Sequence, residues 1–105
     1  SFEVNPENAT QLLWGGAVYQ VTSDMVSDDE LGSYIDILAE SVTFDTETKI
    51  PLSKEDLSKI DWYGENAGQG RECWFYTDVY EIYGTDKAEA VAVEVNNNYY
   101  IAKRQ

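Results

Sequence analysis

The sequence contains no histidine, and Cys73 is its single cysteine. Without histidine, the chain cannot build a Ser–His–Asp or Cys–His catalytic arrangement from its own residues, and the usual zinc sites, which draw on His and several Cys, are excluded as well. One cysteine cannot form an internal disulfide. Because Cys73 stands in the apolar run Cys73–Tyr76, we expect a small buried side chain and not a reactive thiol.

Basic residues are missing from the first half of the chain. Residues 1–48 contain ten acidic and no basic residues, a charge of −10, and residues 49–105 contain ten acidic and seven basic residues, a charge of −3, for a net −13. This charge repels nucleic acid, so we expect no such partner. A cationic peptide or protein would be steered to the acidic half, which makes an immunity or sequestration role a testable hypothesis. The alternative is that the acidity only maintains solubility.

Long hydrophobic runs are also missing, since none approaches the roughly 20 residues that span a bilayer. We therefore expect no transmembrane segment within this chain. The 105 residues predict a single acidic globular domain, with residues 1–10 as a flexible N-terminal segment. The first residues show neither an initiator Met nor a basic-then-apolar leader, so any targeting segment is expected outside this chain.

Strand patterns dominate the first half. The strand segments Leu12–Trp14 and Ala17–Val21 stand on either side of Gly15-Gly16. The glycine pair predicts a tight turn between them, because glycine tolerates the positive φ that tight hairpins need. Tyr34–Phe44 is rich in β-branched and aromatic residues. It predicts one longer strand, with a bulge where the alternation changes phase near Leu38.

The C-terminal third gives the clearest pattern. Trp74–Tyr83 predicts a strand. Val91, Val93 and Val95 alternate with Ala92, Glu94 and Asn96, and this period of two predicts a half-buried strand. Asn96–Asn98 predicts a turn, since Asn is common at positive φ. Tyr99–Ala102 then returns as the second strand of a hairpin.

One short helix is expected in the middle, near residues 53–61. Ser53 is its N-cap, and Leu57 and Ile60 lie on the face expected to pack against the sheet. Earlier, Ser27–Glu30 matches a capping box that starts a single turn. The predicted fold class is α+β, mainly an antiparallel β-sheet with this one helix.

A cluster of carboxylates raises the hypothesis of a calcium site. Asp24, Asp28 and Asp29 lie close in sequence, and hard cations prefer several carboxylate oxygens. Their spacing does not match the Asp-x-Asp-x-Asp-Gly loop, and acids are also favourable at the start of a helical turn. The favoured interpretation is a solvated, capped turn, and no cofactor is expected.

Aromatic side chains give a second kind of candidate site. Trp and Tyr supply large contact area at low entropic cost, so an exposed group of them can stack on sugar rings or anchor a protein partner. The best ligand-binding candidates are Trp62 and Tyr63, between the short helix and a glycine-rich segment, with Trp14 as a third. Trp74, Tyr99 and Tyr100 could join such a face. The alternative for most aromatic residues is a place in the core.

Three segments together resemble a known kind of domain. The order WGG-x-VYQV, V-x-DDELG and VYEIYGTDKAEAVAVEVNNNYYIA is similar to small extracytoplasmic domains of lipoproteins and membrane-anchored proteins of Gram-positive bacteria, mostly uncharacterised. The resemblance covers roughly residues 12–45 and 76–103 and fails between them. It brings no catalytic residue. It implies a place outside the cytoplasm, with anchoring through a segment absent from this chain.

These observations favour a non-catalytic extracytoplasmic module of an exported or anchored bacterial protein. It would bind a protein, peptide or cell-surface ligand, or act as a structural part. The alternative is a small carboxylate-dependent enzyme acting on a glycan or a cationic substrate, since the 20 acids allow a pair at glycosidase separation. We expect binding because the chain lacks most other site chemistry.

Overall fold

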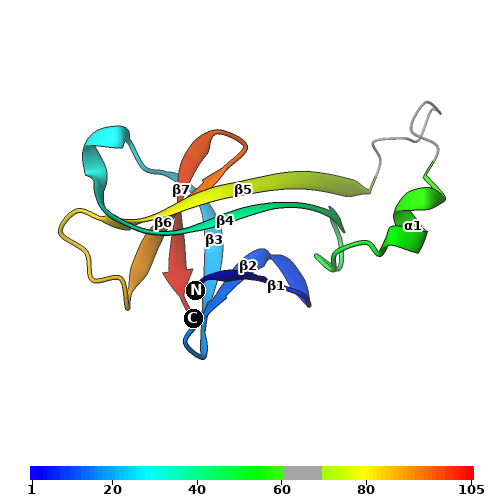
Figure 1. Cartoon of the computed structure of the whole chain (residues 1–105), viewed down its shortest axis with the longest axis horizontal. Coiled ribbons are helices and arrows are strands. Elements are labelled where there is room, and N and C mark those ends of the chain that lie inside the picture. Colours follow the sequence, from blue (N-terminus) through cyan, green and yellow to red (C-terminus); the bar gives the residue numbers. More distant parts are fainter. Residues whose placement is uncertain (61–69) are drawn as a thin grey trace.

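The computed structural model of the chain describes residues 1–60 and 70–105, which form one seven-stranded antiparallel sheet (Figure 1). The strand order is β1-β2-β3-β7-β6-β5-β4. The elements are β1 (Glu3–Asn5), β2 (Asn8–Trp14), β3 (Ala17–Met25), the 3-10 turn η1 (Asp28–Glu30), β4 (Leu31–Asp45), α1 (Lys54–Ser58), β5 (Arg71–Ile82), β6 (Ala90–Val95) and β7 (Asn98–Arg104).

The sheet curls towards a barrel, so that its two edge strands approach each other. The backbone N–H of Phe2 donates to Asp36 Oδ2 on β4 at 2.9 Å. The N–H of Ala9 donates to the Lys49 carbonyl at 2.7 Å, which ties β2 to the segment after β4. The interior of the curl holds the core. Its buried members are Phe2, Val4, Ala9, Leu12, Tyr19, Val21, Val42, Phe44, Tyr76, Val79, Val91, Val93, Val95 and Ala102.

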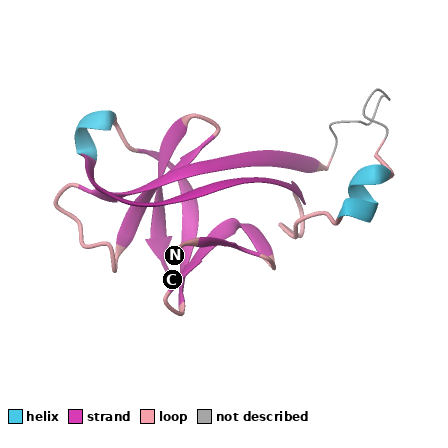
Figure 2. Cartoon of the chain, in the orientation of Figure 1, coloured by secondary structure: helices cyan, strands magenta, loops and turns pink. Residues whose placement is uncertain are grey.

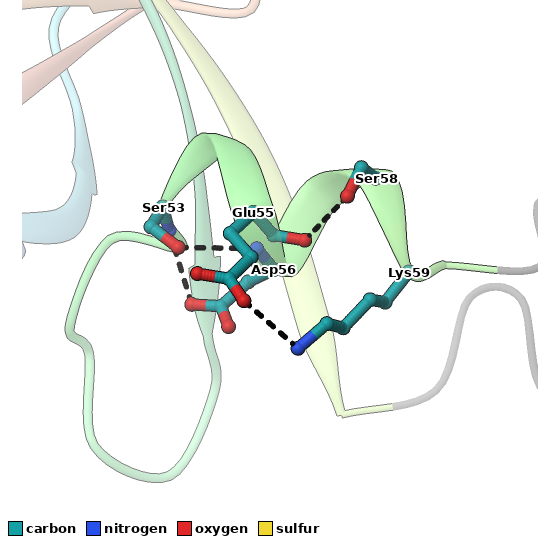
Figure 3. A network of polar contacts seen from close by, with 5 residues as sticks. All are labelled: Ser53, Glu55, Asp56, Ser58 and Lys59. Carbon is teal, nitrogen blue, oxygen red and sulfur yellow. Dashed lines mark hydrogen bonds and ion pairs between the residues drawn. The ribbon is translucent and has the colours of Figure 1, made fainter.

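The antiparallel sheet of the predicted α+β fold is confirmed, but the helical content is minimal (Figure 2). Ser53 caps α1 as predicted, accepting from the Asp56 N–H at 3.1 Å (Figure 3). The α-helix ends at Ser58, and none of its residues is buried. The expected packing of this helix on the sheet is therefore wrong, because α1 lies beyond the end of the β4–β5 pair, where no sheet face can receive it (Figure 1). No helix among the described residues is long and apolar enough to cross a membrane.

The structure places strands and core side chains in residues 1–10, the segment that the sequence suggested as flexible. These residues contain β1 and the start of β2, and the Phe2 side chain is 4% exposed within the core. The ring of Phe2 stacks on Trp14, with 4.9 Å between the centroids. The segment looked flexible because its polar residues lie between apolar ones that reach the core only once the sheet has curled.

The predicted hairpins and the long bulged strand are confirmed. β2 and β3 pair around the Gly15-Gly16 turn, where both glycines have positive φ. In β4 the register shifts between Ile37 and Glu40, and Ala39 between them has φ +46°. β4 spends one extra residue there, which bends the strand around the core.

β5 contains a bulge that changes which residues face the core. Tyr76 pairs with Val95 and Val79 pairs with Val93, so three steps along β5 match two along β6. Tyr76 and Val79 are both fully buried. The bulge therefore switches the inward-facing positions from even to odd residue numbers.

β6 differs from the half-buried strand that its alternation predicted. Val91 and Val93 face the core as expected, but Ala92 is also fully buried. In the register, Ala92 lies between Tyr80 on β5 and Ile101 on β7. The larger neighbours cover the small side chain, so β6 is buried on both faces at Ala92, while Glu94 on the outer face stays half-buried.

Candidate functional site

A recess of about 260 Å³ opens into the described part of the curled sheet between β3, β5 and the β6–β7 turn. Its walls are mainly apolar and its rim is polar. The recess is lined by Val21, Thr22, Ser23, Trp74, Val95, Asn96 and Tyr100. Its volume matches one or two amino-acid side chains and is somewhat below that of typical sites for drug-sized molecules.

On one side, the recess exists because β3 departs from β7. Val21 pairs with Ala102 and Met25 pairs with Tyr100, so four steps along β3 match two along β7. The hydroxyl of Thr22 donates to the Ile101 carbonyl at 2.7 Å, where a regular ladder would use a backbone N–H. Because β3 leaves the ladder after Val21, Thr22 and the exposed Ser23 lie at the rim of the recess.

Trp74 forms the opposite wall. It lies on β5 beyond the last pair with β6, which involves Tyr76. Its ring meets Phe44 and Tyr76 edge-on, with centroid distances of 5.4 and 6.0 Å. These contacts fix the indole, so the wall is formed before any ligand arrives.

Asn96 holds the rim to β5 through its side-chain amide. Its Oδ1 accepts from the Phe75 N–H at 2.9 Å, and its Nδ2 donates to the Cys73 carbonyl at 3.4 Å. Its backbone N–H donates to the Phe75 carbonyl at 3.0 Å. Asn96 therefore continues the sheet beyond the end of β6 and closes the recess on that side.

The role of the Asn96 amide can be tested against its neighbour in the turn. Asn96 and Asn97 have φ of +50° and +71°, which glycine also adopts without strain. We expect Asn96→Gly to lower the free energy of unfolding by about 1–2 kcal/mol relative to Asn97→Gly, because only the first change removes side-chain hydrogen bonds to β5. Urea unfolding followed by circular dichroism measures both variants. Equal stabilities would show that the amide contributes nothing.

The recess can bind an apolar group and orient its polar attachment. Among the residues that line it in the described chain, none is an acid, a lysine, an arginine or a cysteine. Val21 and Val95 offer dispersion contact, and the indole of Trp74 offers a flat aromatic surface. The hydroxyls and amide at the rim offer hydrogen bonds to a peptide backbone.

Of the three predicted aromatic candidates, the described residues contain Trp14. Trp62 and Tyr63 lie outside the described residues, so the prediction for them remains untested. Trp14 lies at another part of the curl, half-buried against Phe2, with Lys87 Nζ at 5.7 Å from its ring centroid. Its contacts fit packing at the margin of the core.

The calcium candidates are all exposed. Asp24 lies at the end of β3, and Asp28 and Asp29 lie in η1. Within residues 1–60 and 70–105, no group of three or more His, Cys, Asp or Glu side chains is arranged to hold a metal ion. The capping box is present, with the Ser27 N–H donating to Glu30 at 3.0 Å, which holds the pKa of Glu30 below its usual value.

The expected burial of Cys73 is wrong, because its side chain is exposed. Trp74 and Tyr76 point inwards on β5, so Cys73 and Phe75 point outwards by alternation. An uninterrupted apolar run hides this alternation. Sequence reasoning also missed most of the recess: Thr22 and Ser23 carry no signal, and Asn96 was recognised only as a turn residue.

Comparison with known proteins places the chain in a defined class. Residues 4–102 match the model of the lantibiotic immunity protein Spa1 C-terminal domain, and the chain belongs to this family. The match spans the middle of the chain, where the resemblance expected from sequence failed. The Gram-positive lipoprotein type of domain is confirmed, and the family is more specific than an uncharacterised one.

Two particular relatives support this assignment. The chain is 32% identical over 104 residues to the nisin immunity protein of Lactococcus lactis subsp. lactis, covering 99% of this chain and 42% of that protein. The solution structure of the C-terminal domain of NisI, a Lactococcus lactis lipoprotein that confers immunity against nisin, matches with a TM-score of 0.85, at 31% identity and over 100% of this chain and 97% of that domain.

The chain spans less than half of the full-length relative. The crystal structure of full-length, lipid-free NisI matches with a TM-score of 0.84 and 28% identity over 100% of this chain and 48% of that one. The structure of the lantibiotic immunity protein SpaI, at 23% identity and a TM-score of 0.63, covers 90% of this chain and 74% of that one, and shares the fold.

Proposed function

We propose that this domain is the ligand-binding part of a lantibiotic immunity lipoprotein, that it acts outside the cytoplasm without catalysis, and that its recess takes an apolar side chain of the lantibiotic peptide. The observation that carries the proposal is the family match over residues 4–102. It is supported by the relative that confers immunity against nisin and by a preformed apolar recess with a hydrogen-bonding rim.

The mechanism that follows is sequestration. A lantibiotic peptide that is bound at the cell surface does not reach the membrane. Binding alone achieves this, without a chemical reaction. Burial of an apolar side chain against Trp74 and Val95 favours binding by about 25 cal/mol per Å² of apolar surface. The rim hydroxyls satisfy the peptide groups that would otherwise be desolvated.

Blocking the recess tests this proposal. Ser23 lies at the rim and is exposed, so Ser23→Trp fills the opening without touching the core. We expect this variant to raise the Kd for the bound lantibiotic at least about 10-fold, since the apolar contact is lost. Isothermal titration calorimetry against a panel of lantibiotics that includes nisin measures the effect.

Ser23→Ala is the matched control, because it removes the same hydroxyl and leaves the recess open. It should bind within about 2-fold of the wild-type domain, since one rim hydrogen bond contributes little. Wild-type affinity in Ser23→Trp, with an unchanged melting temperature, would place the ligand elsewhere. Failure of the wild-type domain to bind any lantibiotic of the panel would contradict the proposed function itself.

A further inference from the structure

The outer face of the sheet carries a row of tyrosines, of which Tyr34 is exposed and Tyr80 and Tyr99 are half-buried. Tyr34 on β4 pairs with Tyr80 on β5, and their rings meet edge-on at 5.4 Å. Tyr80 in turn meets Tyr99 on β7 at 5.8 Å, across the small Ala92 of β6. Tyr34 is 53% exposed, and its neighbour Ile37 is 56% exposed.

Two carboxylates lie within this row. Glu94 pairs with Tyr99, and Asp78 pairs with Ile37. The β5 bulge sets Thr77 and Asp78 opposite the single residue Glu94, whose carboxylate accepts a hydrogen bond from the Thr77 hydroxyl. We call this surface the tyrosine face, and it consists of Tyr34, Ile37, Asp78, Tyr80, Glu94 and Tyr99.

The two strands that carry most of the tyrosine face, β4 and β5, contribute only negative charges around it. β4 contains no lysine or arginine, and neither does β5 after Arg71. Partial burial raises the pKa of Tyr99, and the carboxylates of Glu94 and Asp78 raise it further. The pKa of Tyr34 is also raised, and Asp78 is its main charged neighbour. Like charges on adjacent strands destabilise a sheet, so the arrangement costs the fold free energy.

We propose that the tyrosine face docks a cationic, amphipathic segment of the peptide ligand, with lysine ammonium groups at Asp78 and Glu94 and apolar side chains between the tyrosine rings. The inference rests on the proposed function in that the occupant is the same ligand. Charge complementarity supplies the attraction and the orientation. The rings supply contact area at low entropic cost and cation–π attraction to the ammonium groups.

The same charges disfavour the other occupants of an exposed aromatic face. In a symmetric dimer the face would meet its own copy, which brings Asp78 and Glu94 against the same residues of the second chain. An anionic membrane surface would be repelled for the same reason. A cationic peptide is therefore the partner that the face fits.

The test uses a probe that is independent of lantibiotic chemistry. A short synthetic peptide of lysine and leucine is titrated into the full chain, and the same peptide with glutamate in place of lysine serves as the reference. We expect only the lysine peptide to bind, more weakly at high salt, and to shift the NMR signals of Tyr34, Tyr80 and Tyr99. Absence of binding, or equal binding of both peptides, would overturn the inference.

Charge variants locate the contact. Asp78→Asn combined with Glu94→Gln should raise the Kd for the lysine peptide about 5- to 10-fold, as expected for two partly exposed ion pairs. The matched control is Glu7→Gln combined with Glu89→Gln, which removes the same charge from exposed turns and should leave the Kd within about 2-fold.

The outcomes separate this inference from the proposed function. Unchanged affinity in the face variant, with Ser23→Trp still blocking the lantibiotic, would overturn the tyrosine face and leave the recess in place. Binding of the lysine peptide at the face, without lantibiotic binding by the wild-type domain, would uphold a cationic docking face and contradict the immunity proposal.

Discussion

Tyr76→Ala is expected to lower the free energy of unfolding by about 3–5 kcal/mol, as truncations of large buried aromatic residues do. The Tyr76 side chain is fully buried and meets Trp74 edge-on. Its hydroxyl donates to the Ala9 carbonyl at 2.7 Å, which joins β5 to β2 across the interior of the curl. The truncation removes both the ring and this link, so it also loosens the wall of the recess.

Two further variants separate the parts of this effect. Tyr76→Phe keeps the ring and should cost only about 1–2 kcal/mol, the loss expected for a buried hydrogen bond. Tyr83→Ala removes a tyrosine that is 82% exposed and should leave stability within about 0.5 kcal/mol of the wild type. Urea unfolding followed by far-ultraviolet circular dichroism measures all three. If Tyr76→Ala were as stable as Tyr83→Ala, the proposed packing around Tyr76 would be wrong.

The second large effect is a loss of stability at alkaline pH. Burial raises the pKa of Tyr76 well above its ordinary value of 10.0, and the nearby carboxylate of Glu40 raises it further. In the unfolded chain this phenol ionises near pH 10, while in the fold it keeps its proton. The unfolded state therefore binds fewer protons, and the stability that is fully present below pH 10 falls as the pH rises above it, by about 1.4 kcal/mol per pH unit for one such group.

Urea unfolding at several pH values from neutral to above 10 measures this slope. Tyr76→Phe is the control, because it lacks the ionisable group and keeps the ring. Its stability should fall less steeply than that of the wild type above pH 10. Parallel curves for the two proteins would assign the alkaline loss to other groups.

The local parts of the fold were predictable from the sequence, and the recess was not. The Gly15-Gly16 hairpin, the bulged strand around Leu38 and the Asn96 turn each depend on residues that are neighbours in the chain. The recess depends on where β3 leaves β7, which is a matter of register between strands far apart in sequence. Ser23 shows nothing by itself that indicates its place at the rim.

Long-range contacts also decided the roles of the aromatic residues. Periodicity alone could not show that Trp14 stacks on Phe2, or that Trp74 points inwards while Phe75 points outwards. Tyr99, which the sequence offered for an aromatic face, is half-buried on the outer side of the sheet with its ring against Tyr80. The acidic composition raised the hypothesis of a cationic partner, with solubility as the alternative, but only the strand pairing shows which carboxylates lie beside the rings.

The bulge in β5 has a consequence for how this domain can change during evolution. Before the bulge, Trp74 and Tyr76 face inwards. After it, Val79 faces inwards and Tyr80 belongs to the tyrosine face. Deletion of one residue at Thr77 or Asp78 would place Val79 two positions after Tyr76, so plain alternation would keep both inward while the bulge and its bend were lost. Deletion of Phe75 would instead make Trp74 and Tyr76 neighbours, and one of them would turn away from the core. We therefore expect length changes in this strand to be tolerated only at the bulge.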